Sequence, residues 1–382
     1  MPPEASPTSS PARAPRVAIV GATGAVGEEF LRVLHQRAFP MAGLKLLASP
    51  RSAGKKLAFG DQTLTVEALD AHSFDGVDLA LFSAGGSISR EFAPRAVMAG
   101  AVVVDNSSAF RMSDGVPLVV PEVNPDAVAQ AGIGLRRGGK DDLKAGIIAN
   151  PNCSTILMLM AVHPLHRFAG VERIVVSTYQ AASGAGAAAM RELEQQTREA
   201  LTSPGGTGEV TTLDVFGKQY AFNLFSHNSP VRMGGYNEEE LKMVHETHKI
   251  WSQDAERGSG APPEKIRTAI TATCIRVPVM RAHAESINLT FRDPITEQKA
   301  SELLADAPGV TVQDDRGGNV FPTPLQASHQ DDVFVGRVRR DLSQPEGRGL
   351  DLFVCGDQIR KGAALNAVQI AELLLERRTA AR

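Results

Sequence analysis

Three glycines follow directly on a short apolar run near the start of the chain. Gly21, Gly24 and Gly27 come after the apolar residues 17–20, and apolar side chains then recur at helical spacing over residues 26–34. A strand that turns tightly through glycines into a helix brings the backbone and the helix N–H groups close to a pyrophosphate. The string alone is weak, but a predicted strand before it and a predicted helix after it strengthen it. The sequence therefore predicts a Rossmann-like dinucleotide-binding domain.

The rest of the N-terminal part continues this alternation. Further apolar strands are predicted at residues 44–48, 79–82, 102–104 and 147–149, with a helix at 87–99. Short apolar strands that alternate with helices are typical of parallel βαβ units whose sheet is covered on both faces.

The pattern changes after residue 153, where the strand-like segments become longer and alternate between polar and apolar residues. The predicted strands are at residues 173–179, 268–276, 285–291, 332–339 and 350–355, and the predicted helices are at 187–200, 238–251, 296–305 and 363–377. This mixture indicates an α+β domain on a mixed or antiparallel sheet. The apolar face of the last helix could pack back onto the first domain.

Composition excludes several classes of protein. The 382 residues are 43% hydrophobic and 22% charged, which favours a globular protein over a disordered or fibrous one. Forty Lys and Arg against 43 Asp and Glu give a net charge of −3, so the basic footprint of general nucleic-acid binding is absent. The longest clearly apolar run, residues 156–162, is too short to span a membrane, and we identify no secretory signal.

The cysteines are few and scattered. Cys153, Cys274 and Cys355 form no CxxC pair, which argues against a disulfide framework and a Cys-rich zinc site. We therefore expect no metal and a reducing cytoplasm. Cys274 and Cys355 stand in apolar strands and are interpreted as core residues.

Cys153 stands in a different setting. It lies in the polar turn Asn-Pro-Asn-Cys-Ser-Thr, after a predicted strand and before the apolar helical run of residues 156–162. A helix N-terminus stabilises a thiolate and lowers its pKa, and the same N–H groups can hold an oxyanion. The alternative is a buried structural cysteine, which fits this polar turn poorly. A nucleophilic cysteine also needs a base, and of the nine histidines we favour His283, on a predicted loop or strand start.

The end of the second strand favours one nicotinamide cofactor over the other. NAD sites usually carry an acidic residue there, whereas this chain has Arg51 and Ser52, with Lys55 and Lys56 just beyond. Arginine and serine suit a 2′-phosphate, so we expect NADP. The alternative is an ordinary solvated loop.

Several further motifs occur in a fixed order along the chain. After the glycine turn come Asp-Asn-Ser-Ser-Ala-Phe-Arg at 105–111, the Cys153 turn, Gln180 with Ser-Gly-Ala-Gly at 183–186, Asn-Glu-Glu-Glu-Leu-Lys at 237–242, Cys-Ile-Arg-Val-Pro-Val at 274–279, His283 and Lys-Gly-Ala-Ala-Leu-Asn at 361–366. The set resembles the bacterial aspartate-semialdehyde dehydrogenases from about residue 16 to residue 376.

This resemblance implies a reaction and a set of roles. The reaction is the reversible, NADP-dependent reductive dephosphorylation of L-aspartyl 4-phosphate to L-aspartate 4-semialdehyde and phosphate. It serves the synthesis of lysine and diaminopimelate, threonine, methionine and isoleucine. Cys153 would form a thioacyl enzyme, His283 would be the acid/base and Gln180 would orient the acyl group.

The resemblance also implies the binding residues. Arg276 and Glu239 would hold the amino-acid end of the substrate, where an arginine suits the carboxylate and a glutamate the ammonium. Arg111 and Lys242 would bind phosphate. The cofactor contacts would be Gly21, Thr23, Gly24, Ala25, Val26, Gly27, Arg51, Ser52, Ser183, Gly184 and Asn366. The order His-Asn-Ser-Pro at 227–230 is looser than the family pattern.

The expected architecture is α/β, with an N-terminal Rossmann-like domain and an α+β catalytic and dimerisation domain on a mixed sheet. We expect a disordered tail at 1–15, the NADP-binding domain at 16–152 with the C-terminal helix 361–382, and the catalytic domain at 153–360. Residues 129–144 are interpreted as a surface insertion. The expected partners are the small-molecule substrate and a second copy of the chain, in a homodimer, with neither nucleic acid nor membrane.

Two alternatives remain at this point. One is a related acyl-phosphate reductase such as N-acetyl-glutamyl-phosphate reductase, whose blocked amine would leave Glu239 without a partner. The other is a non-catalytic NADPH-binding regulator, which would have no need of a cysteine at a helix start.

Overall fold

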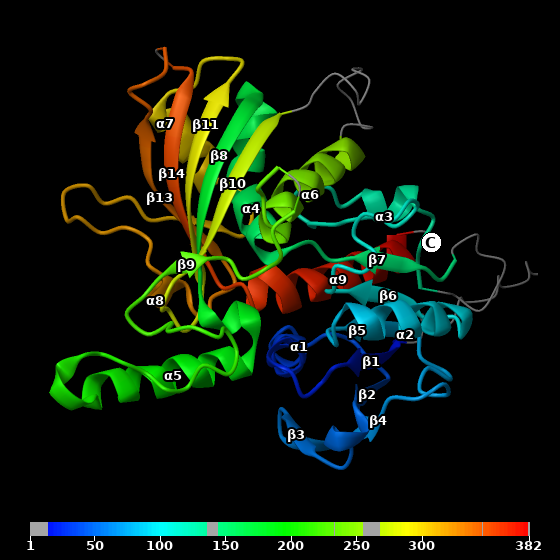
Figure 1. Ribbon diagram of the computed structural model, residues 1–382. Coiled ribbons are helices and arrows are strands. Elements are labelled where there is room, and N and C mark those ends of the chain that lie inside the picture. The colour runs from blue at the N-terminus through cyan, green and yellow to red at the C-terminus, as the bar shows by residue number, and fades with distance from the viewer. Residues whose placement is uncertain (1–13, 136–143, 233, 255–267, 346, 381–382) are drawn as a thin grey trace, which may run out of the picture.

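The computed structural model describes residues 14–135, 144–232, 234–254, 268–345 and 347–380. Most of the tail predicted at 1–15 and the centre of the predicted insertion at 129–144 lie outside these residues. Within them the chain forms two seven-stranded sheets, one from each half of the sequence (Figure 1).

The first sheet has the order β3-β4-β2-β1-β5-β6-β7. Its strands are β1 (Arg16–Val20), β2 (Gly43–Ala48), β3 (Lys56–Phe59), β4 (Gln62–Ala68), β5 (Leu79–Phe82), β6 (Val102–Asp105) and β7 (Ile147–Ala149). All neighbours are parallel except β3, which pairs with β4 as an antiparallel hairpin at the edge. The sequence prediction missed this hairpin, but the parallel core that it predicted is confirmed.

The strand order reverses between β1 and β5. The chain leaves β1 toward β2 on one side and later returns to β5 on the other side. Such a switch point opens a crevice at the carboxyl ends of the strands, where open α/β sheets bind their ligands. The glycine turn that follows β1 therefore lies at this crevice.

Helices cover both faces of the first sheet. Helix α1 (Ala25–Gln36) packs on one face together with α9 (Leu365–Ala380), and the two share a core with Ile19, Leu46 and Leu81. Helix α2 (Gly86–Met98) covers the other face. The last helix thus lies against the first sheet, as Figure 1 shows in red beside α1. The short helix α3 spans Ala127–Gln130.

The second sheet is mixed, which confirms the predicted α+β domain. Its order is β12-β13-β14-β11-β8-β10-β9, with β8 and β10 parallel and β11 antiparallel to β8. The strands are β8 (Val171–Gln180), β9 (Phe225–Ser226), β10 (Ala269–Arg276), β11 (His283–Phe291), β12 (Val310–Val312), β13 (Val333–Arg340) and β14 (Gly349–Gly356). The sequence prediction missed the short strands β9 and β12.

One face of the second sheet packs against α4 (Cys153–Ala169), α6 (Glu238–Asp254) and α7 (Glu297–Ala305) in the larger of the hydrophobic cores. Helix α4 is apolar on nearly all sides, as expected of a helix buried among other elements. Helix α5 (Ala187–Thr202) projects to the side with its own small cluster around Tyr220 (Figure 1). The short helix α8 spans Pro324–Ala327. No helix among the described residues is long and apolar enough to cross a bilayer.

Candidate active site

Strand register brings three of the predicted site residues into one row. Arg276 on β10 pairs with Gln180 on β8. His283, the first residue of β11, lies one position beyond the Ala284–Tyr179 pair, which places it beside Gln180. We call Arg276, Gln180 and His283 the outer row. All three are almost completely buried, and the N-terminus of α4 lies over them.

Cys153 is the first residue of α4. The side chain of the capping residue, Asn152, accepts from the backbone N–H of Ser154 at 3.0 Å and of Thr155 at 3.3 Å. This Asn cap fixes the first turn, because it satisfies two of the N–H groups that a helix start leaves free. The predicted position of Cys153 at a helix N-terminus is therefore confirmed.

The electrostatic setting of Cys153 differs from the expectation of a lowered pKa. Burial, helped by the negative charge of Glu239, raises the pKa of the Cys153 thiol to about 12. Arg111, Arg276 and the backbone N–H of Ser154 act in the opposite direction. The prediction considered the helix N-terminus alone, and it missed the burial of the thiol and the charge of Glu239.

His283 is held as a neutral ring with a defined tautomer. Burial, and next the charge of Arg276, lower the pKa of His283 to about 3. The backbone N–H of Ala181 donates to His283 Nδ1 at 3.0 Å, so the neutral ring carries its proton on Nε2. That Nε2 is buried without a hydrogen-bond partner in the described part of the chain. His283 is therefore set to donate a hydrogen bond from Nε2.

Gly184 leaves room beside this ring. A Cβ on Gly184 would lie 3.0 Å from His283 Nε2 and 3.1 Å from a terminal nitrogen of Arg276. A side chain at this position would fill the space that the two donors share. The predicted cofactor segment around Gly184 thus adjoins the outer row.

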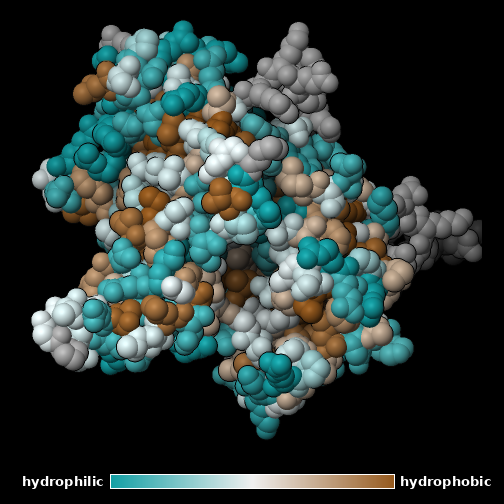
Figure 2. All heavy atoms as spheres, viewed as in Figure 1, coloured by the Kyte–Doolittle hydropathy of each residue, from teal (hydrophilic) through white to brown (hydrophobic). Residues whose placement is uncertain are grey.

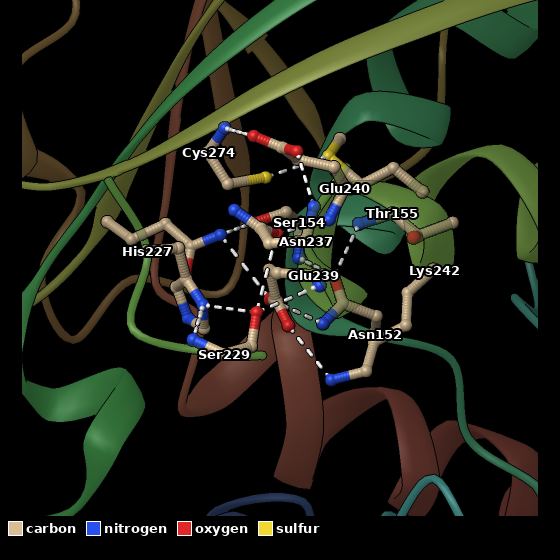
Figure 3. A network of polar contacts seen from close by, with 12 residues as sticks. Asn152, Ser154, Thr155, His227, Ser229, Asn237, Glu239, Glu240, Lys242 and Cys274 are labelled. Atoms are coloured by element: carbon tan, nitrogen blue, oxygen red, sulfur yellow. Dashed lines mark hydrogen bonds and ion pairs between the residues drawn. The ribbon is translucent and has the colours of Figure 1, made fainter. Parts of the chain in front are cut away.

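Glu239 is the central carboxylate of the site (Figure 3). It accepts from Lys242 Nζ at 2.9 Å and from Asn152 Nδ2 at 2.8 Å, and its own backbone N–H donates to Ser229. Burial acts to raise the pKa of Glu239, but Lys242 and these hydrogen bonds hold it well below its usual range. Glu239 and Lys242 therefore form an i,i+3 ion pair on α6, with Glu239 ionised near Cys153.

Arg276 is oriented by residues that the sequence prediction passed over. Its guanidinium donates to Asn228 Oδ1 at 3.2 Å, to His227 at 2.8 Å and to the carbonyl of Ala181 at 3.2 Å. Burial lowers the pKa of His227 to about 4, which keeps it neutral as an acceptor. The segment that looked looser than the family pattern therefore holds a site arginine.

Arg111 is also held in a fixed position, by a buried ion pair. It donates to Glu246 Oε1 on α6 at 3.0 Å and to the carbonyls of Asn150 at 2.9 Å and Asn106 at 2.8 Å. The other oxygen of Glu246 accepts from the backbone N–H of Asn152 at 2.6 Å. A guanidinium has five N–H donors, so two remain for a ligand. Glu246 was missed because nothing in its local sequence distinguishes it from other helix carboxylates.

The glycine turn is shaped by close backbone contacts. Gly21 has a positive φ of 87°, and a Cβ there would lie 2.3 Å from the carbonyl oxygen of Ser83 after β5. A Cβ on Gly27 would lie 2.2 Å from the carbonyl oxygen of Gly21. Both glycines are therefore required by the geometry. The Ser83–Gly86 loop lines the same crevice, and the glycine pair after an apolar strand could have identified it.

The predicted cofactor loop lies beside this turn. Thr23 Oγ1 donates to Ser52 Oγ at 3.3 Å, and Arg51 next to it is exposed to solvent. Gly24 caps α1, whose first residues are Ala25 and Val26. Asn366 behaves differently, because its amide donates to Asn150 Oδ1 at 2.6 Å and to the carbonyl of Val119 at 3.0 Å. It is fully buried on α9.

A π-helix (Arg360–Ala364) covers Cys153 before α9 begins. A Cβ on Gly362 would lie 2.8 Å from Cys153 Cβ. Next to it the buried Lys361 donates to Asn366 and Gln369 on α9 and to Glu122, and the last contact joins the cover to a loop of the first sheet. The surface is hollowed between the two halves near the middle of the view in Figure 2.

The described residues contain no group of three or more His, Cys, Asp or Glu placed to hold a metal ion. The site chemistry available in them is a thiol at a helix start, a neutral imidazole donor, two arginines and an ionised glutamate. Such a set suits attack on an activated carbonyl whose substrate carries both positive and negative groups.

Comparison with known proteins gives matches over nearly the whole chain. A family model described as the NAD binding domain of semialdehyde dehydrogenase matches residues 16–131, and one described as the semialdehyde dehydrogenase dimerisation domain matches residues 162–361. The chain is 54% identical over 362 residues to an aspartate-semialdehyde dehydrogenase of Synechocystis sp., covering 95% of this chain and 98% of that protein. It is 44% identical over 361 residues to that of Bacillus subtilis, covering 94% and 96%.

Solved structures give the same result. The crystal structure of aspartate semialdehyde dehydrogenase II from Vibrio cholerae, complexed with ASA, superimposes with a TM-score of 0.83. The two chains are 43% identical, and the match covers 95% of this chain and 98% of the other.

Proposed function

Because the chain belongs to the aspartate-semialdehyde dehydrogenase family, we propose that it converts L-aspartyl 4-phosphate reversibly to L-aspartate 4-semialdehyde and phosphate, with NADP as its cofactor. The observation that carries the residue-level proposal is the arrangement of the outer row beneath Cys153. We also assign the chain the place in the synthesis of lysine and diaminopimelate, threonine, methionine and isoleucine that its resemblance to this family implies.

In the first step Cys153 is the nucleophile. Its thiolate attacks the acyl carbon, the bond from that carbon to the phosphate oxygen breaks, and a thioester and phosphate result. The N–H groups of Asn152, Ser154 and Thr155 at the start of α4 already have acceptors, so the Cys153 N–H is the one that stabilises the developing oxyanion. The thiol gives up its proton only at a cost, because burial and Glu239 hold its pKa at about 12, and this proton leaves with the phosphate as hydrogen phosphate. Arg111 and Arg276 offset that cost, and an anionic substrate brought between them places the acyl carbon at the sulfur.

In the second step NADPH, when bound, supplies a hydride. His283 faces the acyl oxygen from Nε2 and donates to it as negative charge builds up, while the Gln180 amide orients the acyl group. The C–S bond then breaks, the aldehyde leaves and the thiolate is restored. This assigns His283 the acid side of the acid/base role.

The two ends of the substrate meet opposite charges. Glu239 is ionised and suits the ammonium group of the substrate. When that group binds, it replaces Lys242 as the partner of Glu239. Arg276 suits the carboxylate in a bidentate contact, and its orientation by His227 and Asn228 supports this role. Lys242, which is part-exposed, and the two remaining donors of Arg111 suit the phosphate.

The first domain fits NADP. The glycine turn at the switch point suits a pyrophosphate at the start of α1, and the exposed Arg51 with Ser52 suits a 2′-phosphate. Gly184 leaves space at His283 for the nicotinamide end. Asn366 acts here through Asn150, because its amide is bonded to that loop.

We also assign the chain to a homodimer in the cytoplasm. The matched dimerisation domain and the exposed apolar residues Phe222, Leu224 and Val231 support the dimer. A reducing compartment keeps the Cys153 thiol available for reaction.

Replacement of the nucleophile tests the proposal. We expect Cys153→Ser to lower turnover of L-aspartate 4-semialdehyde with phosphate and NADP by at least about 10³-fold. NADP binding, followed by fluorescence quenching, should stay as in the wild type. Cys355→Ser, at a buried cysteine on the opposite face of the second sheet, is the matched control and should stay active. Persisting activity in Cys153→Ser would overturn the assigned mechanism.

A further inference from the structure

A second row of polar residues lies directly below the outer row. Glu285 on β11 pairs with Thr178 on β8, and Thr178 pairs with Cys274 on β10. Each residue is two positions from a member of the outer row on the same strand, so both rows point to the α4 face of the sheet. We call Glu285, Thr178 and Cys274 the inner row. All three are completely buried.

Glu285 is the residue of the inner row whose burial most disfavours the folded state. Its exposure is 0%, and neither carboxyl oxygen has a hydrogen-bond partner among the described residues. Burial raises the pKa of Glu285 well above its usual range. A buried carboxyl without hydrogen bonds destabilises the folded state, so its presence in a native core calls for an explanation.

The Ser154 hydroxyl is the polar group that acts on Glu285. It opposes burial in setting the pKa of Glu285, although no hydrogen bond of normal geometry joins the two in this arrangement. Ser154 is the second residue of α4, next to Cys153, and its backbone N–H is fixed by the Asn152 cap. Ser154 Oγ also accepts from Gln180 Nε2 at 3.1 Å. Gln180 Nε2 also donates to Thr178 Oγ1 at 3.3 Å, so the inner row is connected to the outer row both directly and through Ser154.

The charge state of Glu285 matters because a negative charge near Cys153 raises the pKa of its thiol. The site already holds one ionised carboxylate, Glu239, which raises the pKa of Cys153. The groups around Glu285 that sense its charge are Cys274 on β10 and Cys355 on β14, and burial keeps both of these thiols neutral. No cation offsets a negative charge on Glu285 in the part of the chain that the structure describes.

We propose that Glu285 is a positioning residue that, as a neutral carboxylic acid, holds the Ser154 hydroxyl and through it the Gln180 amide at Cys153. A neutral acid can both donate to and accept from a hydroxyl, so it serves Ser154 whichever way that hydroxyl turns while Gln180 moves with the acyl group. Unlike a carboxylate, it adds no negative charge near the thiolate. This assignment rests on the proposed function, because it gives Glu285 a purpose only if Gln180 orients an acyl group.

Three single variants and one double variant test it. Glu285→Leu removes the polar group at similar volume, and we expect kcat to fall about 10- to 100-fold with little change in KM. Glu285→Gln keeps a neutral donor and acceptor and should restore most of the lost kcat. Ser154→Ala should lower kcat like Glu285→Leu, and the double variant should be no worse than either single one, since both act through one contact.

Thr290→Val is the matched control. Thr290 lies on the same strand, and its hydroxyl oxygen is also buried without a partner. Its removal should stabilise the protein without lowering kcat. If Glu285→Leu kept the wild-type kcat, or if Glu285→Gln were as slow as Glu285→Leu, the positioning role would be refuted.

A pH series gives an independent readout. The folded pKa of Glu285 lies above the ordinary 4.5, so the folded protein holds a proton that the unfolded chain releases. Wild-type stability therefore falls as the pH rises from 4.5 toward the folded pKa, and Glu285→Gln lacks this loss. We expect the Tm of Glu285→Gln to exceed that of the wild type by a margin that grows with pH. A margin of the opposite sign would mean that Glu285 is ionised and paired, contrary to the proposal.

Failure of this proposal can be told apart from failure of the proposed function. If Cys153→Ser is inactive and Glu285→Leu has the wild-type kcat, the enzyme assignment stands and the positioning role is wrong. If Cys153→Ser stays active, the mechanism itself is wrong, whatever Glu285 does.

Discussion

The backbone of Gly362 lies against the side chain of Cys153, so closely that a Cβ on Gly362 would be 2.8 Å from Cys153 Cβ. Gly362→Ala must therefore push the nucleophile or the π-helix aside. Because displacements of about 1 Å cost on the order of 10²-fold in rate, we expect kcat to fall about 10- to 100-fold. Steady-state kinetics in both directions would measure it.

Gly43→Ala is the control for this prediction. Gly43 begins β2, and an added Cβ there has nothing within 4 Å, so kcat should stay at the wild-type value. Full activity in Gly362→Ala would show that the π-helix yields easily and does not fix Cys153.

The proposed contact of Arg51 with a 2′-phosphate predicts a change in the preference between the two nicotinamide cofactors. Arg51→Ala removes the charge that suits a 2′-phosphate, and a loss of about 1.4 kcal/mol in binding corresponds to a tenfold rise in the KM for NADP. The KM for NAD should not change. Lys56→Ala, at an exposed lysine on β3, should leave both values as they are. Equal effects on the two cofactors in Arg51→Ala would refute the 2′-phosphate contact.

His283 should not titrate in the range where the enzyme is assayed. Its pKa is lowered from 6.5 to about 3, so the ring stays neutral at any pH well above 3, with the proton on Nε2. The ¹⁵N NMR spectrum of histidine-labelled protein should show a protonated Nε2 and an unprotonated Nδ1 that do not shift with pH near neutrality. The signal is assigned by its loss in His283→Asn. A signal that titrates near pH 6.5 would contradict this state.

The lowered pKa of His283 also makes its contribution to stability depend on pH. Unfolding releases His283 to its ordinary pKa, so below pH 6.5 the unfolded chain binds a proton that the folded protein does not. Stability from this residue is therefore present above pH 6.5 and is lost as the pH falls toward 3.

Glu246 holds both Arg111 and the residue that caps α4. Glu246→Gln removes the carboxylate from a buried ion pair and leaves the arginine without a counter-charge, which costs about 3 kcal/mol or more. Urea denaturation should show this loss. Glu194→Gln breaks the exposed Arg198–Glu194 pair on α5 and should cost less than about 0.5 kcal/mol. Similar losses in the two variants would mean that Arg111 does not depend on Glu246.

Local patterns predicted the elements that carry the chemistry. The glycine turn after residues 17–20 and the polar turn before an apolar helix at Cys153 are contiguous in sequence, so their geometry follows from neighbouring residues. The edge hairpin β3–β4 was missed because its residues are largely polar or exposed and lack the apolar runs of the central strands.

The residues that hold the site in place could not be predicted in this way. Glu246 reaches Arg111 across 135 positions, and Arg276 is oriented by His227 across 49. Glu285 joins the site only through strand register, which the sequence does not specify residue by residue. The expected low pKa of Cys153 was wrong because burial raises it first, and the charge of Glu239, from a distant helix, adds to that effect.

The segment that covers the site is joined to the turn before Cys153 although the two are far apart in sequence. Asn366 bonds Asn150 from 216 positions away. During synthesis Cys153 therefore leaves the ribosome long before the segment that covers it. A nascent chain that already exposes Cys153 cannot yet close the site, and its thiol is open to oxidation during that interval. The time that passes before the π-helix docks therefore sets how long the Cys153 thiol stays uncovered.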